Sequence, residues 1–163
     1  MTDFTTRPEI LGTFGVFTST HWIASAVGMS ILEKGGNAFD AAVAAGFVLQ
    51  IVEPHLCGPG GDMPAIIYSK KNDKVEVICA QGPAPAGATI EHYTAEGLTL
   101  IPGDGLLSTV IPGAFDGWML MLRDYGTMSV REVLEPAIYY AEQGHPVLER
   151  VSNTIKGLAS FFE

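Results

Sequence analysis

The chain has 163 residues, a formal net charge of −9 at pH 7 and a hydrophobic content of 47%. This length and apolar content predict one packed globular domain, or most of one, and exclude a disordered chain. With only 9 Lys and Arg residues, the sequence lacks the basic surface that binds nucleic acids or anionic membranes, and no apolar run reaches the ~18 residues of a membrane span.

The amino-terminal residues and the cysteines bear on the cellular compartment. Residues 1–9 contain charged side chains and no apolar run, so they do not resemble a secretory signal. We therefore expect a cytoplasmic protein in which Cys57 and Cys79 are reduced thiols without metal-ligand spacing.

The first predicted elements are a strand and a helix. Residues 12–18 are β-prone, and Ser19 or Thr20 then offers a suitable N-cap for a helix. Apolar residues recur at helical spacing over residues 23–32, which predicts one buried stripe, and the glycine pair at 35–36 ends the helix.

A second helix is predicted over residues 38–52, with Asn37 as its cap. This segment is apolar on nearly every side, and Pro54 stops it. A helix of this kind is expected to be buried between layers, close to the hairpin that follows.

The rest of the chain predicts a hairpin, a long loop and further helices, and Ser129 and Glu132 form a capping box. The expected elements are strands 65–69 and 75–80 joined by a turn at 71–73, a loop 82–105 with a short helix at 91–95, and helices 114–124, 130–143 and 147–162. This order indicates layered α/β or α+β packing, and we take α+β as the expected fold class. Because Phe161 and Phe162 would be exposed beside the terminus, we expect that the remainder of the polypeptide is missing.

Two motifs that suggest ligand binding have structural explanations. The loop of residues 58–61, GPGG, lacks the GxxxxGK[ST] pattern of a phosphate-binding loop, so close backbone approach explains it better. No histidine pair has the i, i+4 spacing of a helical metal site. We expect His21 and His55 to be polar residues near helix ends, and we predict no metal and no cofactor.

Few residues qualify as a catalytic nucleophile. The candidates are Cys57, Ser108, Thr109 and Thr2, which would become amino-terminal if Met1 were removed. No GxSxG elbow is present, and no cation stands beside Cys57 in the sequence to activate it. We therefore assign no catalytic residue to this chain.

The block from residue 20 to residue 61 resembles the opening signature of the γ-glutamyltranspeptidase family. The residues that carry the resemblance are His21, Ala24, Ser25, Gly28, Ile31, Leu32, 35–38, 40–44, 52–54, Gly58, Gly60 and Gly61. Residues 110–128, 136–137 and 141–144 also resemble the family, so the similarity spans nearly the whole chain. The block itself reads as two packed helices joined by a glycine turn, so it indicates the fold, and the resemblance alone supplies the function.

The resemblance implies an N-terminal-nucleophile hydrolase with an αββα sandwich. In this family the precursor cuts itself at an internal threonine, which then begins the small subunit and attacks the amide with its own α-amine as base. That threonine and the oxyanion donors lie in the carboxy-terminal portion. Residues 1–163 are therefore expected to be the N-terminal part of a single domain in the large subunit, inactive alone, whose partners are the missing portion and a small-molecule amide.

One substrate-binding residue is expected in this part of the family fold. Relatives carry an arginine just after the second hairpin strand, where it grips the α-carboxylate of the glutamyl group. Gln81 occupies that position here. This departure places the chain near the γ-glutamyltranspeptidase-like and cephalosporin-acylase-like members.

Three functional hypotheses remain open from the sequence. The first is an autoprocessing γ-glutamyltransferase or hydrolase that uses substrates of the glutathione type. The second keeps the fold but cleaves a non-glutamyl amide, such as a cephalosporin side chain. The third is a non-catalytic binding module.

Overall fold

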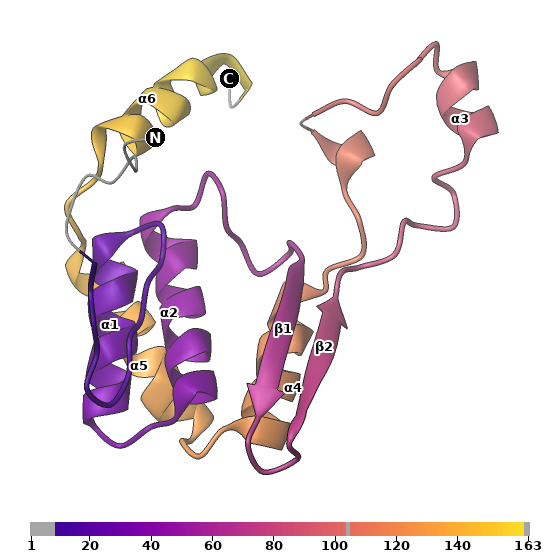
Figure 1. The fold of residues 1–163 in the computed structure, drawn as a ribbon. Coiled ribbons are helices and arrows are strands. Elements are labelled where there is room, and N and C mark those ends of the chain that lie inside the picture. Colours follow the sequence, from indigo (N-terminus) through magenta and orange to yellow (C-terminus); the bar gives the residue numbers. More distant parts are fainter. Residues whose placement is uncertain (1–8, 104, 162–163) are drawn as a thin grey trace, which may run out of the picture.

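In the computed structural model, residues 9–103 and 105–161 are described, and they form α-helices together with one two-stranded antiparallel sheet (Figure 1). The α+β composition agrees with the sequence prediction. Helices α1 (Trp22–Glu33) and α5 (Val130–Gln143) both pack against α2 (Ala38–Val52), with α5 behind the other two, and we call these three helices the helical layer. The hairpin, with helix α4 (Ala114–Tyr125) behind it, stands beside them (Figure 1). One apolar core runs through both parts.

Helix α1 spans Trp22–Glu33 and buries the predicted stripe, including Ile23, Val27 and Ile31. Its N-cap differs from the prediction, because His21 takes that position and its side chain accepts a hydrogen bond from the backbone N–H of Ile23. The predicted strand over residues 12–18 is wrong: this segment pairs with no strand in the described part of the chain and runs as an irregular segment. Phe17 explains its apolar character, since it packs against the core beside Gly28 of α1.

Helix α2 spans Ala38–Val52 and is the most buried element of the helical layer. Nine of its 15 residues are buried, and only the first, Ala38, is exposed. Helices α1, α4 and α5 pack around it. The expected proximity to the hairpin is indirect, because α4 packs against both α2 and the two strands.

The start of α2 is fixed by Asp40, which is fully buried. Asn37 and Asp40 form a capping box, and Asp40 also accepts hydrogen bonds from the backbone and hydroxyl of Thr127 and the backbone of Met128. Burial by itself raises the pKa of Asp40, but these hydrogen bonds and that from Asn37 outweigh it and leave the pKa below its ordinary value. Asp40 thus ties α2 to the connection between α4 and α5.

The hairpin consists of β1, Met63–Ser69, and β2, Lys74–Ala80. Met63 pairs with Ala80 at the open end and Ser69 pairs with Lys74 at the turn. Asp73, with φ of 50°, is a left-handed residue within the predicted turn at 71–73.

The two faces of the hairpin have different surroundings. Alternate residues, including Met63, Ile67 and Ile78, enter the core against α4, which spans Ala114–Tyr125. On the other face, Ile66 pairs with Val77, and these side chains are 79% and 68% exposed. This outer face is therefore an apolar surface that the described residues do not cover.

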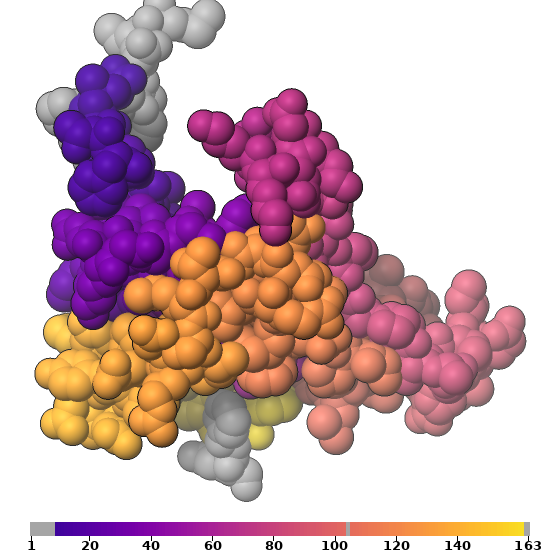
Figure 2. All heavy atoms as spheres, turned by 90° about the horizontal axis from the view of Figure 1, so that it is seen from below, coloured from indigo at the N-terminus to yellow at the C-terminus, as the bar shows by residue number. Residues whose placement is uncertain are grey.

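Residues 82–113 leave the end of β2, project away from the body and return to α4. Figure 2 shows their pink atoms to one side of the orange atoms of α4 and α5. This excursion contains the expected short helix, α3, Ile90–Ala95, and a 3-10 turn, Leu106–Ser108. We name residues 82–113 the excursion.

The last helices lie next to α1 and α2. Helix α5, Val130–Gln143, starts with the predicted capping box of Ser129 and Glu132. Helix α6, Glu149–Gly157, is shorter than the predicted helix over 147–162, because the chain breaks at Leu158 into a 3-10 turn, Ala159–Phe161. The predicted end, Phe162, lies outside the described residues. No helix in the described part of the chain is long and apolar enough to cross a membrane.

Candidate functional site

Gln81, the predicted substrate-binding residue, lies directly after β2 at the open end of the hairpin. Since Met63 pairs with Ala80, the register places Asp62 opposite Gln81. The Nε2 group of Gln81 donates a hydrogen bond to Oδ2 of Asp62 at 3.3 Å, and the Cys79 thiol lies 3.7 Å from Oε1 as a weak donor. All three side chains are exposed, so this polar cluster faces outward.

A cavity of about 430 Å³ lies beside Gln81 between β2, the start of the excursion and α4. Its carboxylates are Glu76 on β2 and Asp116 on α4, and none of the described residues that line it is Lys, Arg or His. Glu76 interacts with Lys74 at 2.8 Å and accepts hydrogen bonds from Asn72 and Tyr125. The hydrogen bond from Lys74, followed by that from Asn72, lowers the pKa of Glu76, so the cavity keeps an anionic wall.

Close contacts between backbones hold the base of the excursion beside Gln81. A Cβ atom on Gly82 would lie 1.3 Å from the carbonyl oxygen of Ile111, and one on Gly113 would lie 2.7 Å from that of Ala80. The carbonyl of Gly61 accepts hydrogen bonds from Gly113 and Ala114, at the start of α4. The close backbone approach predicted for residues 58–61 is wrong, because a Cβ atom would meet nothing within 4 Å at Gly58 or Gly60 and only an ordinary contact of 3.4 Å at Gly61.

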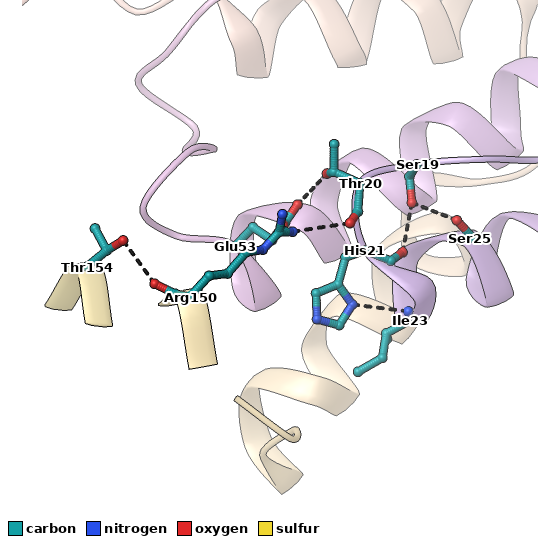
Figure 3. Close-up of polar contacts among 8 residues, drawn as sticks. All are labelled: Ser19, Thr20, His21, Ile23, Ser25, Glu53, Arg150 and Thr154. Carbon is teal, nitrogen blue, oxygen red and sulfur yellow. Dashed lines mark hydrogen bonds and ion pairs between the residues drawn. The ribbon is translucent and has the colours of Figure 1, made fainter. Parts of the chain in front are cut away.

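A second polar cluster consists of Thr20, Glu53 and Arg150 and joins α1, α2 and α6. Glu53, the C-cap of α2, is fully buried and accepts hydrogen bonds from the Thr20 hydroxyl and the Arg150 guanidinium (Figure 3). Arg150 also donates to the carbonyl of Thr20 at 3.2 Å. Because a buried carboxylate requires partners, this cluster fixes α6 against the ends of α1 and α2.

His21 lies in the same region and is 1% exposed. Its Nδ1 accepts the cap hydrogen bond from Ile23, so the ring is neutral there, and its Nε2 has no partner among the described residues (Figure 3). Burial lowers the pKa of His21, and electrostatic interaction with His145 and Arg150 lowers it further. The cap position fits the expectation that His21 is a polar residue near a helix end.

The structure does not bring the candidate nucleophiles together with Gln81. Burial raises the pKa of the half-buried Cys57, which favours its protonated, unreactive form. The hydroxyl of Ser108 donates to the carbonyl of Gly105, and Thr109 is exposed at the end of the 3-10 turn. Thr2 lies outside the described residues. Within the described ranges, no group of three His, Cys, Asp or Glu side chains is arranged to hold a metal ion.

Sequence reasoning missed Asp62 and the cluster of Glu53, Thr20 and Arg150. The signal for Asp62 was the hairpin register, because extending the ladder by one pair places it opposite Gln81. The signal for Glu53 was a lone carboxylate after the apolar segment 41–52, but no pattern identified Arg150, which is 97 residues away, as its partner.

Comparisons with known proteins identify the family of the chain. The family model described as "Gamma-glutamyltranspeptidase" matches residues 24–163, so the chain belongs to the γ-glutamyltranspeptidase family. The chain is 40% identical to the "Glutathione hydrolase-like YwrD proenzyme" of Bacillus subtilis (strain 168) over 140 residues, which are 85% of this chain and 26% of the relative.

Two further similarities support the same family and fold. The chain is 36% identical over 167 residues to the "Acylase ACY 1 proenzyme" of Pseudomonas sp. (strain SE83), covering 94% of this chain and 29% of the relative. A solved structure, "Structure of LmbA2991HD", superposes with a TM-score of 0.91 at 52% identity, covering 98% of this chain and 27% of that one. The chain thus spans between a quarter and a third of the length of each of these proteins.

Proposed function

We propose that the full-length protein is an autoprocessing amide hydrolase or acyltransferase of the N-terminal-nucleophile class, and that this chain forms the first part of its large subunit. The observation that carries the proposal is the family match over residues 24–163. The names of two relatives, a glutathione hydrolase-like proenzyme and an acylase proenzyme, support it, because both describe amide-cleaving precursors.

In this proposal the hairpin belongs to one sheet of an αββα sandwich. One face of the hairpin packs on α4, whereas Ile66 and Val77 on the opposite face are largely exposed. Where two sheets stack, the faces that meet are apolar and interdigitate. A second sheet from the remainder of the polypeptide would therefore cover the exposed face that carries Ile66 and Val77. The nucleophile and the oxyanion donors belong to that remainder, and the isolated chain is inactive.

The proposed reaction is transfer of a γ-glutamyl group from an amide of the glutathione type to water or an amine. According to the family resemblance, Gln81 occupies the position where an arginine of the relatives binds the α-carboxylate of the glutamyl group. An arginine makes a charge-assisted, bidentate pair, and a hydrogen bond to a charged group contributes about 1.5–3 kcal/mol. Replacing that interaction with a neutral amide would weaken use of glutathione by roughly ten- to a hundredfold.

A second candidate, an acylase that cleaves a non-glutamyl amide, is favoured by the contact between Gln81 and Asp62. A cavity with Glu76 and Asp116 in its wall, and no basic residue among its described lining, is poorly suited to a substrate carboxylate. We therefore keep amide hydrolysis as the reaction and leave the acyl group to experiment.

The test uses the full-length protein expressed from its own gene. Self-cleavage is expected to give two fragments on a denaturing gel, and the processed protein is expected to hydrolyse an amide that lacks the α-carboxylate better than it hydrolyses glutathione. Gln81→Arg is expected to raise kcat/KM for glutathione by roughly ten- to a hundredfold. A protein that neither cleaves itself nor hydrolyses any of these amides would contradict the proposed function.

A further inference from the structure

Asp62 contacts the predicted substrate-binding residue, and nothing in the sequence pattern assigned it a role. It is held at the open end of the hairpin by the pairing of Met63 with Ala80 on one side and by the Gly61 carbonyl contacts to α4 on the other. Both anchors are backbone interactions. The backbone of Asp62 is therefore held opposite Gln81 by contacts within the described residues.

The hydrogen bond to Asp62 determines which way the Gln81 amide points. An ionised carboxylate only accepts hydrogen bonds, so the amide nitrogen must face Oδ2 of Asp62, at 3.3 Å. The amide oxygen then faces the thiol of Cys79, at 3.7 Å. A glutamine amide has two N–H donors and two oxygen lone pairs, so one donor and one acceptor remain for a ligand.

Charge around Gln81 adds a second constraint. Asp62 places a negative charge in contact with the amide. Asp116 lies in the wall of the neighbouring cavity, whereas Glu76, farther along β2, is paired with Lys74. A substrate carboxylate at this point would meet like charges, whereas a carboxamide would match the free donor and the free acceptor of Gln81 without repulsion.

We propose that Asp62 is a specificity-determining residue that acts through Gln81, so that this end of the substrate site takes an uncharged carboxamide and disfavours a carboxylate. The inference rests on the proposed amide-hydrolase function and names the substrate class for its site. Asp62 is a positioning residue in this scheme, because it orients Gln81 and sets the local charge without touching the scissile bond.

The experiment compares two p-nitroanilides of glutamic acid, both linked through the γ-carbonyl, one with a free α-carboxylate and one with an α-carboxamide. The readout is the ratio of their kcat/KM values for the full-length, processed protein. The native ratio is expected to favour the carboxamide. Asp62→Asn is expected to reduce that preference by about fivefold, mainly by lowering KM for the carboxylate substrate, because it removes a charge exposed to solvent.

Two variants separate this role from a general structural one. Asp62→Glu keeps the charge and is expected to retain the native preference, whereas Glu96→Gln removes an exposed carboxylate beyond α3 and is expected to leave the ratio unchanged. A loss of activity equal on both substrates in Asp62→Asn, or an unchanged ratio, overturns the inference while leaving the amidase proposal intact. A native protein that cleaves itself but hydrolyses neither anilide also overturns the inference and leaves the amidase proposal standing, whereas one that does neither contradicts both.

Discussion

The helical layer and the hairpin region differ in which side chains they bury and which they expose. In the helical layer, the charged side chains of Asp40 and Glu53 are completely buried and have hydrogen-bond partners. In the hairpin region, the apolar pair Ile66 and Val77 is exposed, and Gln81 faces open space beside a cavity. The first region pairs its buried carboxylates within the described residues, whereas the second presents apolar and polar surfaces that the described residues leave open.

The largest effect is expected from Asp40→Ala, which removes the acceptor for Asn37, Thr127 and Met128. Since several buried donors lose a charged partner at once, the opening free energy of the helical layer should fall by about 3–5 kcal/mol. Amide hydrogen exchange of α2 and α5 in the full-length protein measures this loss. Asp124→Ala, which changes an exposed aspartate at the end of α4, serves as the control and should leave this exchange unchanged.

The next effect tests whether Arg150 stabilises the layer through a buried charge. Arg150→Met leaves Glu53 buried without its cation, so α6 should detach more readily and the layer should lose about 2 kcal/mol. Arg123→Met is the matched control, because Arg123 pairs with the exposed Asp124 and should give no measurable change. Equal exchange rates in both variants would show that the Glu53 cluster does not hold α6.

A third change acts on the hairpin region and should alter activity more than stability. Gly82→Ala would place a Cβ atom against the Ile111 carbonyl and displace the segment that carries Gln81. We expect kcat/KM to fall by about tenfold, with exchange in α2 unaffected, since small displacements in a site reduce rates strongly. Gly87→Ala, where no atom lies within 4 Å, should behave like the native protein. Native activity in both variants would mean that the base of the excursion does not position the site.

The smallest expected effect is the pH dependence conferred by His21. Its pKa in the folded state lies below the ordinary 6.5, mainly because of burial, so the unfolded chain binds more protons just below that pH. The stabilisation from neutral His21 is thus complete above about pH 6.5 and decreases as the pH falls. His21→Asn can still cap α1 and should flatten the change in α1 exchange between pH 7 and pH 5. An unchanged slope would assign the dependence to another group.

Much of the fold could be predicted because local patterns determine it. Asn37 with Asp40, and Ser129 with Glu132, identify helix starts, and the alternation in β1 and β2 identifies the hairpin. Residues 12–18 misled the prediction, because an apolar, β-prone segment can pack against a helix without any strand partner.

The candidate site was less accessible to sequence reasoning. Gln81 was identified only through the family resemblance, and no local pattern distinguishes it from other exposed glutamines. Asp62 and Arg150 required tertiary information, because their partners lie 19 and 97 residues away. Contacts at that separation follow from how the elements pack, which residue spacing alone does not specify.

We propose that a further part of the protein covers and extends the hairpin, whereas the buried carboxylates of the helical layer are paired within the described residues. The most direct measurement is amide hydrogen exchange on the full-length, processed protein, resolved for β1 and β2. In the described residues these strands pair only with each other, so the N–H groups on their outer edges have no sheet partner. We expect these amides to exchange as slowly as those of α2, because neighbouring strands pair with them and a second sheet covers Val75 and Val77. Rapid exchange of these amides, at the rate of the excursion, would contradict it.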